Sequence, residues 1–260
     1  MRFEFIYIIV LRHFFNTFFQ QEQGHTRFRL HSHCLEAPSA RSIPYLNQVG
    51  FGDVAKIHTT KVDSKLVVAL LERWRPETHT FHFPTGESTI TLEDVRMLFG
   101  LRIDGQAVNG PTQLGRSVYM EHLGIEPPTE DRVKNQVKIT WLQEVLAYLK
   151  NREAPTEEEN ILHAKIYILL LISCFLFPNK SQNLMHCCWV QFVGNLETCN
   201  NYSWGSACLA NLYRCMCKAS YKGVKSIGGC VLLMNIWEFW HIPFIAPMTT
   251  QVPEYPYATR

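Results

Sequence analysis

His79 and His82 lie three residues apart in the segment RWRPETHTFHFPTGESTITLEDV (residues 73–95), with Glu93 and Asp94 a short way behind them. Histidine and carboxylate side chains are the usual ligands of catalytic metals and the usual carriers of protons. Residues three apart in an extended strand point to opposite faces, however, so the two histidines are poorly placed to share a metal. The two carboxylates fall in an expected first helical turn, where the helix dipole favours negative charge. We therefore interpret all four residues as structural.

Two further reaction types would need residues that the chain offers only in part. A metallophosphatase holds two metal ions about 3.5–4 Å apart with clustered Asp, His and Asn ligands. The sequence GFGD at residues 50–53 matches that pattern only in part. A pyridoxal-dependent aminotransferase needs a Schiff-base lysine and a phosphate-binding cup. Lys180, in the turn FPNKSQN, is the best candidate, but a solvated loop cation is the simpler interpretation. The motifs G-x-S-x-G, Walker A and G-x-G-x-x-G after a strand are absent. We predict no enzyme and no cofactor.

The chain has nine cysteines, and eight of them lie between Cys174 and Cys230. Their number is odd and no C-x-x-C pair occurs, so neither a disulfide framework nor a zinc finger is indicated. Several fall inside apolar helical patterns, which is typical of reduced, buried thiols. The dense groups HSHC, HCC and CMC lack zinc-finger spacing. We predict no metal site.

The candidate contact surface is basic. Arg214 and Lys218 are one helical turn apart, and Lys222 and Lys225 follow the expected helix end. They could bind an acidic partner, nucleic acid included, but cations at a helix C-terminus are also favoured by the dipole while they remain in solvent. Both interpretations stay open.

The overall charge balance of the chain argues against a protein whose main role is to bind the phosphate backbone of a nucleic acid. Of the 25 basic and 23 acidic residues, five arginines and three glutamates lie in residues 1–48, so residues 49–260 hold 20 of each sign. A nucleic-acid-binding surface normally shows a clear basic excess, because each neutralised phosphate needs a lysine or arginine.

The elements that position these residues are mainly helices. Apolar spacing and capping signals predict helices over residues 63–75 and 91–100, with a short hairpin over 80–91 between them. Thr91 and Asp94 have capping-box spacing at the start of the second helix. A further helix is expected from Thr140, capped with Gln143. Three more are expected over residues 156–177, 202–220 and 227–243, and Thr156 with Glu157, Glu158 and Glu159 caps the first of these.

The predicted fold class is therefore mainly α, a helical domain with one small β-hairpin. Residues 1–44 are aromatic, then polar, and have no sustained period, so we expect a poorly ordered extension before a domain over 45–260. Seven apolar residues from Phe5 to Leu11 are few for a signal peptide. The run of twelve apolar residues at 166–177 has the length of a buried helix and is too short for a membrane span.

Three segments resemble the plant mobile domain, a transposon-associated family that includes MAINTENANCE OF MERISTEMS-like proteins and phosphatase 7 long-form homologues. They are LLERWRPETHTFHFPTGESTITLEDVRMLFGLRIDGQAVNG, FLFPNKSQNLMH, and YSWGSACLANLYRCMCKAS with IGGCVLLMNIWEFW. The likeness extends from about Gly50 to the C-terminus. The chain stops where the family normally continues with more helices, so we expect a C-terminally truncated copy.

This resemblance implies a non-catalytic interaction domain in the nucleus, linked to meristem maintenance and development and to transposon silencing, with protein partners and no small-molecule substrate. The alternative is a nucleic-acid-binding remnant of a mobile-element transposase or nuclease. That alternative needs acidic residues that converge on a metal. The available ones are Asp53, Glu87, Glu93, Asp94 and Asp104.

Overall fold

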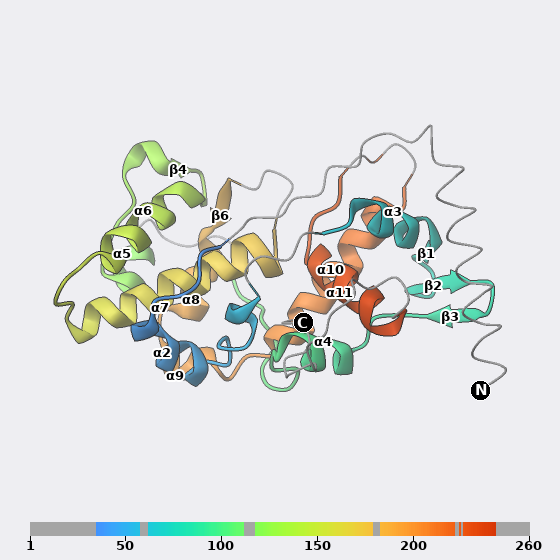
Figure 1. The fold of residues 1–260 in the computed structure, drawn as a ribbon. Coiled ribbons are helices and arrows are strands. Elements are labelled where there is room, and N and C mark those ends of the chain that lie inside the picture. The colour runs from blue at the N-terminus through green and yellow to red at the C-terminus, as the bar shows by residue number, and fades with distance from the viewer. Residues whose placement is uncertain are drawn as a thin grey trace.

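The computed structural model describes residues 35–242, apart from 58–61, 112–117, 179–182, 222–223 and 225. In this part the chain is mainly helical, as predicted, and its helices form two adjoining groups that share a continuous hydrophobic core (Figure 1). Three lysines discussed above, Lys180, Lys222 and Lys225, lie outside the described residues.

The first group of helices surrounds α7 (Glu157–Leu171), which continues as the π-helical segment η4 (Ile172–Leu176). The predicted capping box at its start is confirmed. The Thr156 hydroxyl accepts from the Glu159 N–H at 3.3 Å, and the Glu159 carboxylate accepts from the Thr156 N–H at 2.9 Å. The helices packed against α7 are α6 (Ile139–Lys150), α2 (Ile43–Gln48) and α8 (Val190–Val193).

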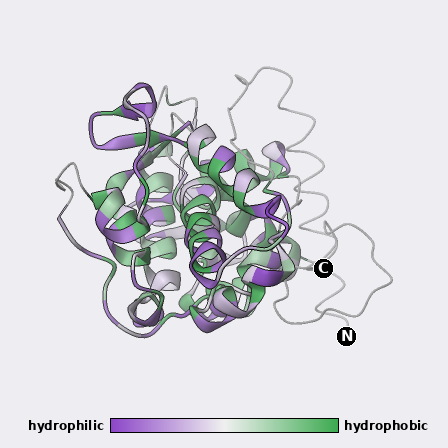
Figure 2. Cartoon of the chain, turned by 90° about the vertical axis from the view of Figure 1, so that its left-hand side faces the viewer, coloured by the Kyte–Doolittle hydropathy of each residue, from purple (hydrophilic) through white to green (hydrophobic). Residues whose placement is uncertain are grey.

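The segment from α7 through η4 is apolar because it forms the centre of the core. Its composition and length, Glu157–Leu176, would suffice to cross a membrane. Here every residue from 166 to 176 is buried by protein. Figure 2 shows hydrophobic residues concentrated on the inner helices and hydrophilic residues in the peripheral turns. The prediction of a buried central helix is confirmed.

The second group contains α3 (Ser64–Arg73), α4 (Leu92–Phe99), α10 (Trp204–Ala219) and α11 (Val231–His241). Helix α4 packs on both α10 and α11, and α3 packs on α11. As predicted, α4 ends at Gly100, whose φ of 69° is the left-handed conformation that glycine adopts without strain. A side chain there would also collide with Asp53.

Each group of helices carries one small antiparallel sheet (Figure 1). The predicted hairpin is present as β2 (Thr80–Phe83) and β3 (Gly86–Ser88), and β1 (Trp74–Arg75) pairs with β2 as a third strand. A second sheet, which the prediction of a single hairpin missed, has the order β4–β5–β6. Its strands are β4 (Arg132–Val133), β5 (Gln136–Lys138) and β6 (Leu184–His186). Strands of two or three residues carry too little alternation to stand out in a sequence.

The packed body includes ten residues that we expected in the N-terminal extension, 35–44. Leu35 is buried, and the Glu36 carbonyl accepts a hydrogen bond from the Tyr167 hydroxyl at 2.9 Å. Ser42 is also buried, and its hydroxyl lies 2.5 Å from His163 Nδ1 on α7. The remaining short helices are η1 (Ala40–Ser42), η2 (Val54–Lys56), α5 (Val118–Leu123), η3 (Thr129–Asp131), η5 (Cys187–Trp189) and α9 (Leu196–Cys199).

Two helix starts differ from their predictions. Thr140 does not cap α6, because the helix begins at Ile139 directly after β5. The Ile139 N–H, the first of the helix, donates to the Asn183 carbonyl beside β6. Helix α11 begins at Val231 rather than near residue 227, after the bend at Gly229, whose φ is 77°.

Candidate functional site

Four of the five acidic residues that could serve a nuclease have local structural partners instead. Asp94 completes the Thr91 capping box and lies 2.8 Å from His241 Nε2. The hydrogen bonds that it accepts hold its pKa below the ordinary value, against the effect of burial. Of the other candidates, Asp53 pairs with Lys56 at 2.8 Å, Asp104 pairs with Arg102 at 3.2 Å, and Glu87 lies 3.1 Å from His82.

No three His, Cys, Asp or Glu side chains gather as a metal-binding group within the described ranges. Glu93, the fifth candidate, is exposed in the first turn of α4. The structure therefore does not bring the five carboxylates together in one site.

The two histidines of the opening motif make local structural contacts at the surface. His79 adopts a left-handed φ of 54° in the turn before β2, and its ring stacks on Tyr213 at 5.5 Å. His82 lies within β2 and points to Glu87 on the neighbouring strand. The two do not share a ligand site.

The eight cysteines in the described part are all free thiols. Burial raises the pKa of Cys174 and of Cys199 to about 12, so both stay protonated near neutral pH. A protonated, buried thiol is a poor nucleophile and a poor metal ligand. Cys34 lies outside the described residues.

A cleft of about 630 Å³ lies where β5, β6, η4, η5, α8 and α10 meet. Its aromatic wall is formed by Phe177, Trp189 and Phe192. The rings of Phe177 and Trp189 have centroids 4.6 Å apart, and Trp189 is 6.4 Å from Phe192. The size falls within the range of roughly 300–1,000 Å³ that is usual for ligand sites.

The polar groups of the cleft are hydrogen-bond donors and amides. Asn109, Gln136 and Asn211 supply amides, and among the described residues of the lining Arg214 is the one that is charged. His186 also lines it, and burial lowers its pKa, so the ring is neutral near pH 7. Because His186 Nδ1 accepts from the Cys188 N–H at 3.2 Å, the proton of the neutral ring is on Nε2. The described part of the lining thus offers hydrogen-bond donors and amide oxygens to a ligand, and no carboxylate.

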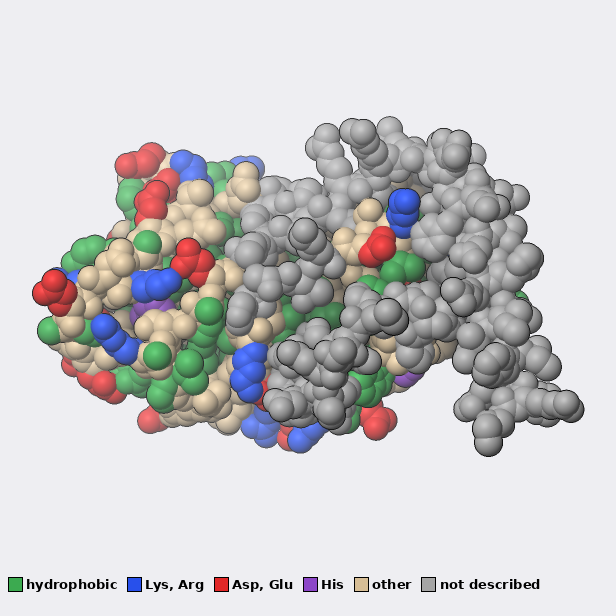
Figure 3. All heavy atoms as spheres, viewed as in Figure 1, with side chains coloured by type: hydrophobic (Ala, Val, Ile, Leu, Met, Phe, Trp, Pro, Cys, Tyr) green, Lys and Arg blue, Asp and Glu red, His purple; other side chains and the backbone are tan. Residues whose placement is uncertain are grey.

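Two of the four predicted contact residues can be placed. Arg214 is exposed on α10 at the edge of the cleft. Lys218 is exposed one turn further along α10 and is not part of the cleft lining. Neither forms an ion pair among the residues described. On the face shown in Figure 3, the acidic and basic side chains that can be seen are interspersed and form no patch of one sign.

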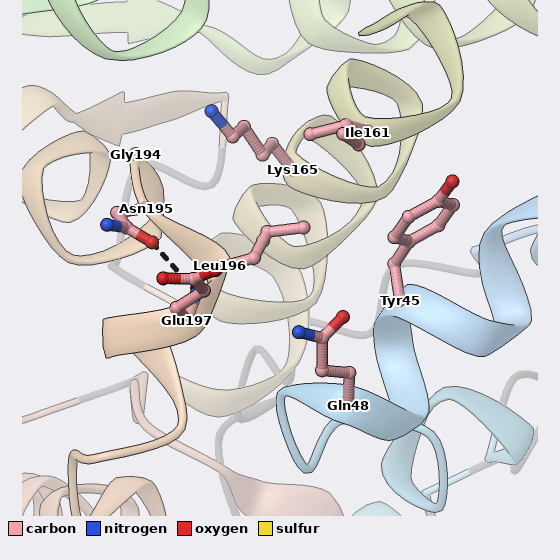
Figure 4. Close-up of a pocket in the computed structure, with 8 residues that line it drawn as sticks. All are labelled: Tyr45, Gln48, Ile161, Lys165, Gly194, Asn195, Leu196 and Glu197. Atoms are coloured by element: carbon pink, nitrogen blue, oxygen red, sulfur yellow. Dashed lines mark hydrogen bonds between the residues drawn. The ribbon is translucent and has the colours of Figure 1, made fainter. Parts of the chain in front are cut away.

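A second, more open depression of about 490 Å³ lies between α2, α7 and the start of α9 (Figure 4). Gln48 and Leu196 extend into it, whereas the Lys165 amine donates to the His122 carbonyl at 3.0 Å. Burial lowers the pKa of Lys165. Asn195 uses its side-chain oxygen to cap α9, where it accepts from the Glu197 N–H. These polar groups serve local structure and do not converge on a point in the depression.

Sequence reasoning identified Arg214 but not the cleft that it borders. The lining comes from four separated stretches of chain, and the aromatic residues in them look like ordinary core residues. The sequence of FLFPNKSQNLMH did point to one of the four stretches, but only as a family signature.

Comparison with known proteins places this chain beside one family. The family model described as "Plant mobile domain" matches residues 50–260. The chain is 39% identical to the Arabidopsis thaliana protein "Serine/threonine-protein phosphatase 7 long form homolog" over 196 residues. These residues cover 75% of the chain and 14% of that protein. No solved structure matches it.

Two further Arabidopsis relatives share a large part of the chain. It is 32% identical to "Protein MAIN-LIKE 2" over 238 residues, which cover 90% of the chain and 35% of that protein. It is 31% identical to "Protein MAINTENANCE OF MERISTEMS" over 211 residues, which cover 80% of the chain and 44% of that protein. The matched region is less than half the length of each of these relatives.

Proposed function

Because the chain belongs to the plant mobile domain family, we propose that it is a non-catalytic interaction domain that binds a partner protein in the cleft beside Arg214. One contrast supports this proposal. The acidic side chains Asp53, Asp94 and Asp104 are held by caps or ion pairs. Arg214, in contrast, borders an open cleft and has no ion-pair partner in the described part of the chain.

The biological setting of the proposal comes from the family. The name of one relative, MAINTENANCE OF MERISTEMS, supports a part in meristem maintenance and development. Action in the nucleus and in transposon silencing rests on what the family resemblance implies. Another relative carries the word phosphatase in its name, but the chain covers only 14% of that protein. The proposal does not include that activity.

Nucleic-acid binding stands second. A polynucleotide is normally held by several lysines and arginines on successive phosphates. The described residues that line the cleft include a single cation, and residues 49–260 carry as many acidic as basic groups. Arg214 and Lys218 together give this alternative its support.

Affinity purification from isolated plant nuclei tests the proposed function. The tagged chain is compared with Arg214→Glu, which reverses the charge at the cleft, and with Lys65→Glu as a matched control. Lys65 is exposed on α3, on a different helix from the cleft. We expect specific proteins to be recovered at least about fivefold less with Arg214→Glu than with Lys65→Glu, because loss of a well-placed charge pair costs about 1 kcal/mol or more.

Two results would contradict the proposal. One is an absence of the tagged chain from nuclei. The other is a set of recovered proteins that Arg214→Glu and Lys65→Glu leave equally unchanged.

A further inference from the structure

The cleft beside Arg214 has an apolar wall suited to a flat ring. Phe177 and Trp189 form a tilted ring pair with an interplanar angle of 31°, and both are only half-buried. Phe192 backs them and is itself buried. A large aromatic side chain buries about 150–250 Å² when it packs, and aromatic pairs add about 0.5–1.5 kcal/mol to this. An aromatic group is therefore the apolar ligand that this wall accommodates best.

The charge of the cleft restricts which other group a ligand can carry beside its aromatic ring. Arg214 is the only charged residue in the part of the lining that the structure describes, and the amide groups of Asn109 and Asn211 lie in the same lining. An arginine fork binds a carboxylate through two parallel hydrogen bonds. A methylated lysine, which aromatic cages bind through cation–π contacts, is disfavoured because the described lining residues include a cation and no carboxylate. A polynucleotide is disfavoured because one cation can neutralise only one phosphate.

We infer that the cleft binds a short segment of a partner protein in which an aromatic side chain lies next to an aspartate or glutamate. The aromatic ring packs on Trp189 and Phe177, and the acidic side chain pairs with Arg214. This inference rests on the proposed function and specifies the chemistry of the partner. The aromatic ring supplies most of the binding energy, and the carboxylate fixes the orientation of the segment. Aromatic anchors and charged groups have these same two roles at other protein interfaces.

Selection from a phage-displayed library of random decapeptides tests the inference on the full chain. Phage retained by the wild type are counter-selected on Ala210→Trp, because Ala210 is exposed on α10 and lines the cleft, so a tryptophan there fills it. Ala210→Ser is the matched control. A circular dichroism melt checks that each variant is folded, and Arg214→Glu provides a second variant at an exposed position.

We expect the selected sequences to place Phe, Tyr or Trp within two positions of Asp or Glu. A synthetic consensus peptide, measured by fluorescence polarisation, should bind at least about tenfold more weakly to Ala210→Trp and to Arg214→Glu, and equally to Ala210→Ser. A consensus that is basic, or one without an aromatic residue, overturns the inference. So does the absence of any enriched sequence.

A 20-nucleotide oligo(dT) probe is measured in parallel. If the probe binds the wild type, if Ala210→Trp abolishes that binding, and if the affinity falls steeply with salt, the cleft is a nucleic-acid site and the peptide inference fails. If no peptide binds but Arg214→Glu still loses its nuclear partners, the inference fails and the proposed function stands.

Discussion

At the scale of single residues, the most unusual group is a carboxyl inside the core, Glu238 on α11. It is fully buried, and neither of its oxygens has a hydrogen-bond partner of good geometry in the described part of the chain. Burial raises its pKa to about 8; Asp63 adds to the rise, while Asn235 and Arg73 oppose it. An unpaired buried charge is costly, so the group is held protonated near neutral pH.

Glu238 should make the protein less stable as the pH rises from about 4.5 to about 8. In that window the unfolded chain has already ionised the carboxyl and the folded chain has not, so each pH unit favours unfolding by up to about 1.4 kcal/mol. Glu238→Gln should remove this slope from the free energy of unfolding measured in urea between pH 5 and 8. Glu144→Gln, at an exposed position of α6, should leave it in place. An unchanged slope in Glu238→Gln would show that the carboxyl is not buried as described.

At the scale of elements, capping patterns predicted helix starts well when the helix followed a loop. The boxes at Thr91 and Thr156 are both present as predicted. Thr140 and Gln143 show the same spacing, yet α6 starts from the second sheet, where pairing with β6 satisfies its first N–H. A long-range strand contact thus replaced a local cap, and no pattern within Thr140–Gln143 could reveal that.

Thr156→Ala should lower the free energy of unfolding by about 1 kcal/mol, because it leaves the Glu159 N–H at the start of the central helix without its side-chain acceptor. Thr140→Ala is the matched control. Thr140 is exposed in the first turn of α6 and makes no cap, so alanine there should be neutral or slightly stabilising. Urea unfolding of both variants measures the difference. Equal losses in the two would refute the assignment of the caps.

At the scale of the whole molecule, the fold class was readable from the sequence and the cleft was not. Periodic apolar residues showed the helices, and their spacing was enough to predict a mainly α domain with a buried helix near residues 156–177. The cleft depends on the second sheet, whose strand β6 lies almost 50 residues beyond β5. Contacts over such distances bring Trp189 and Arg214 together, and neither residue differs in its local pattern from an ordinary core or surface residue.

Site-specific photo-crosslinking in isolated nuclei tests most directly whether this chain acts by binding a partner in the cleft. A benzophenone amino acid replaces Lys218, which is exposed on α10 one turn beyond Arg214 and leaves the cleft itself open, or Tyr148, which is also exposed but lies on α6. Our account predicts discrete protein adducts from position 218 and none of the same mass from position 148. Adducts that are identical from both positions, or that arise only from position 148, would contradict it.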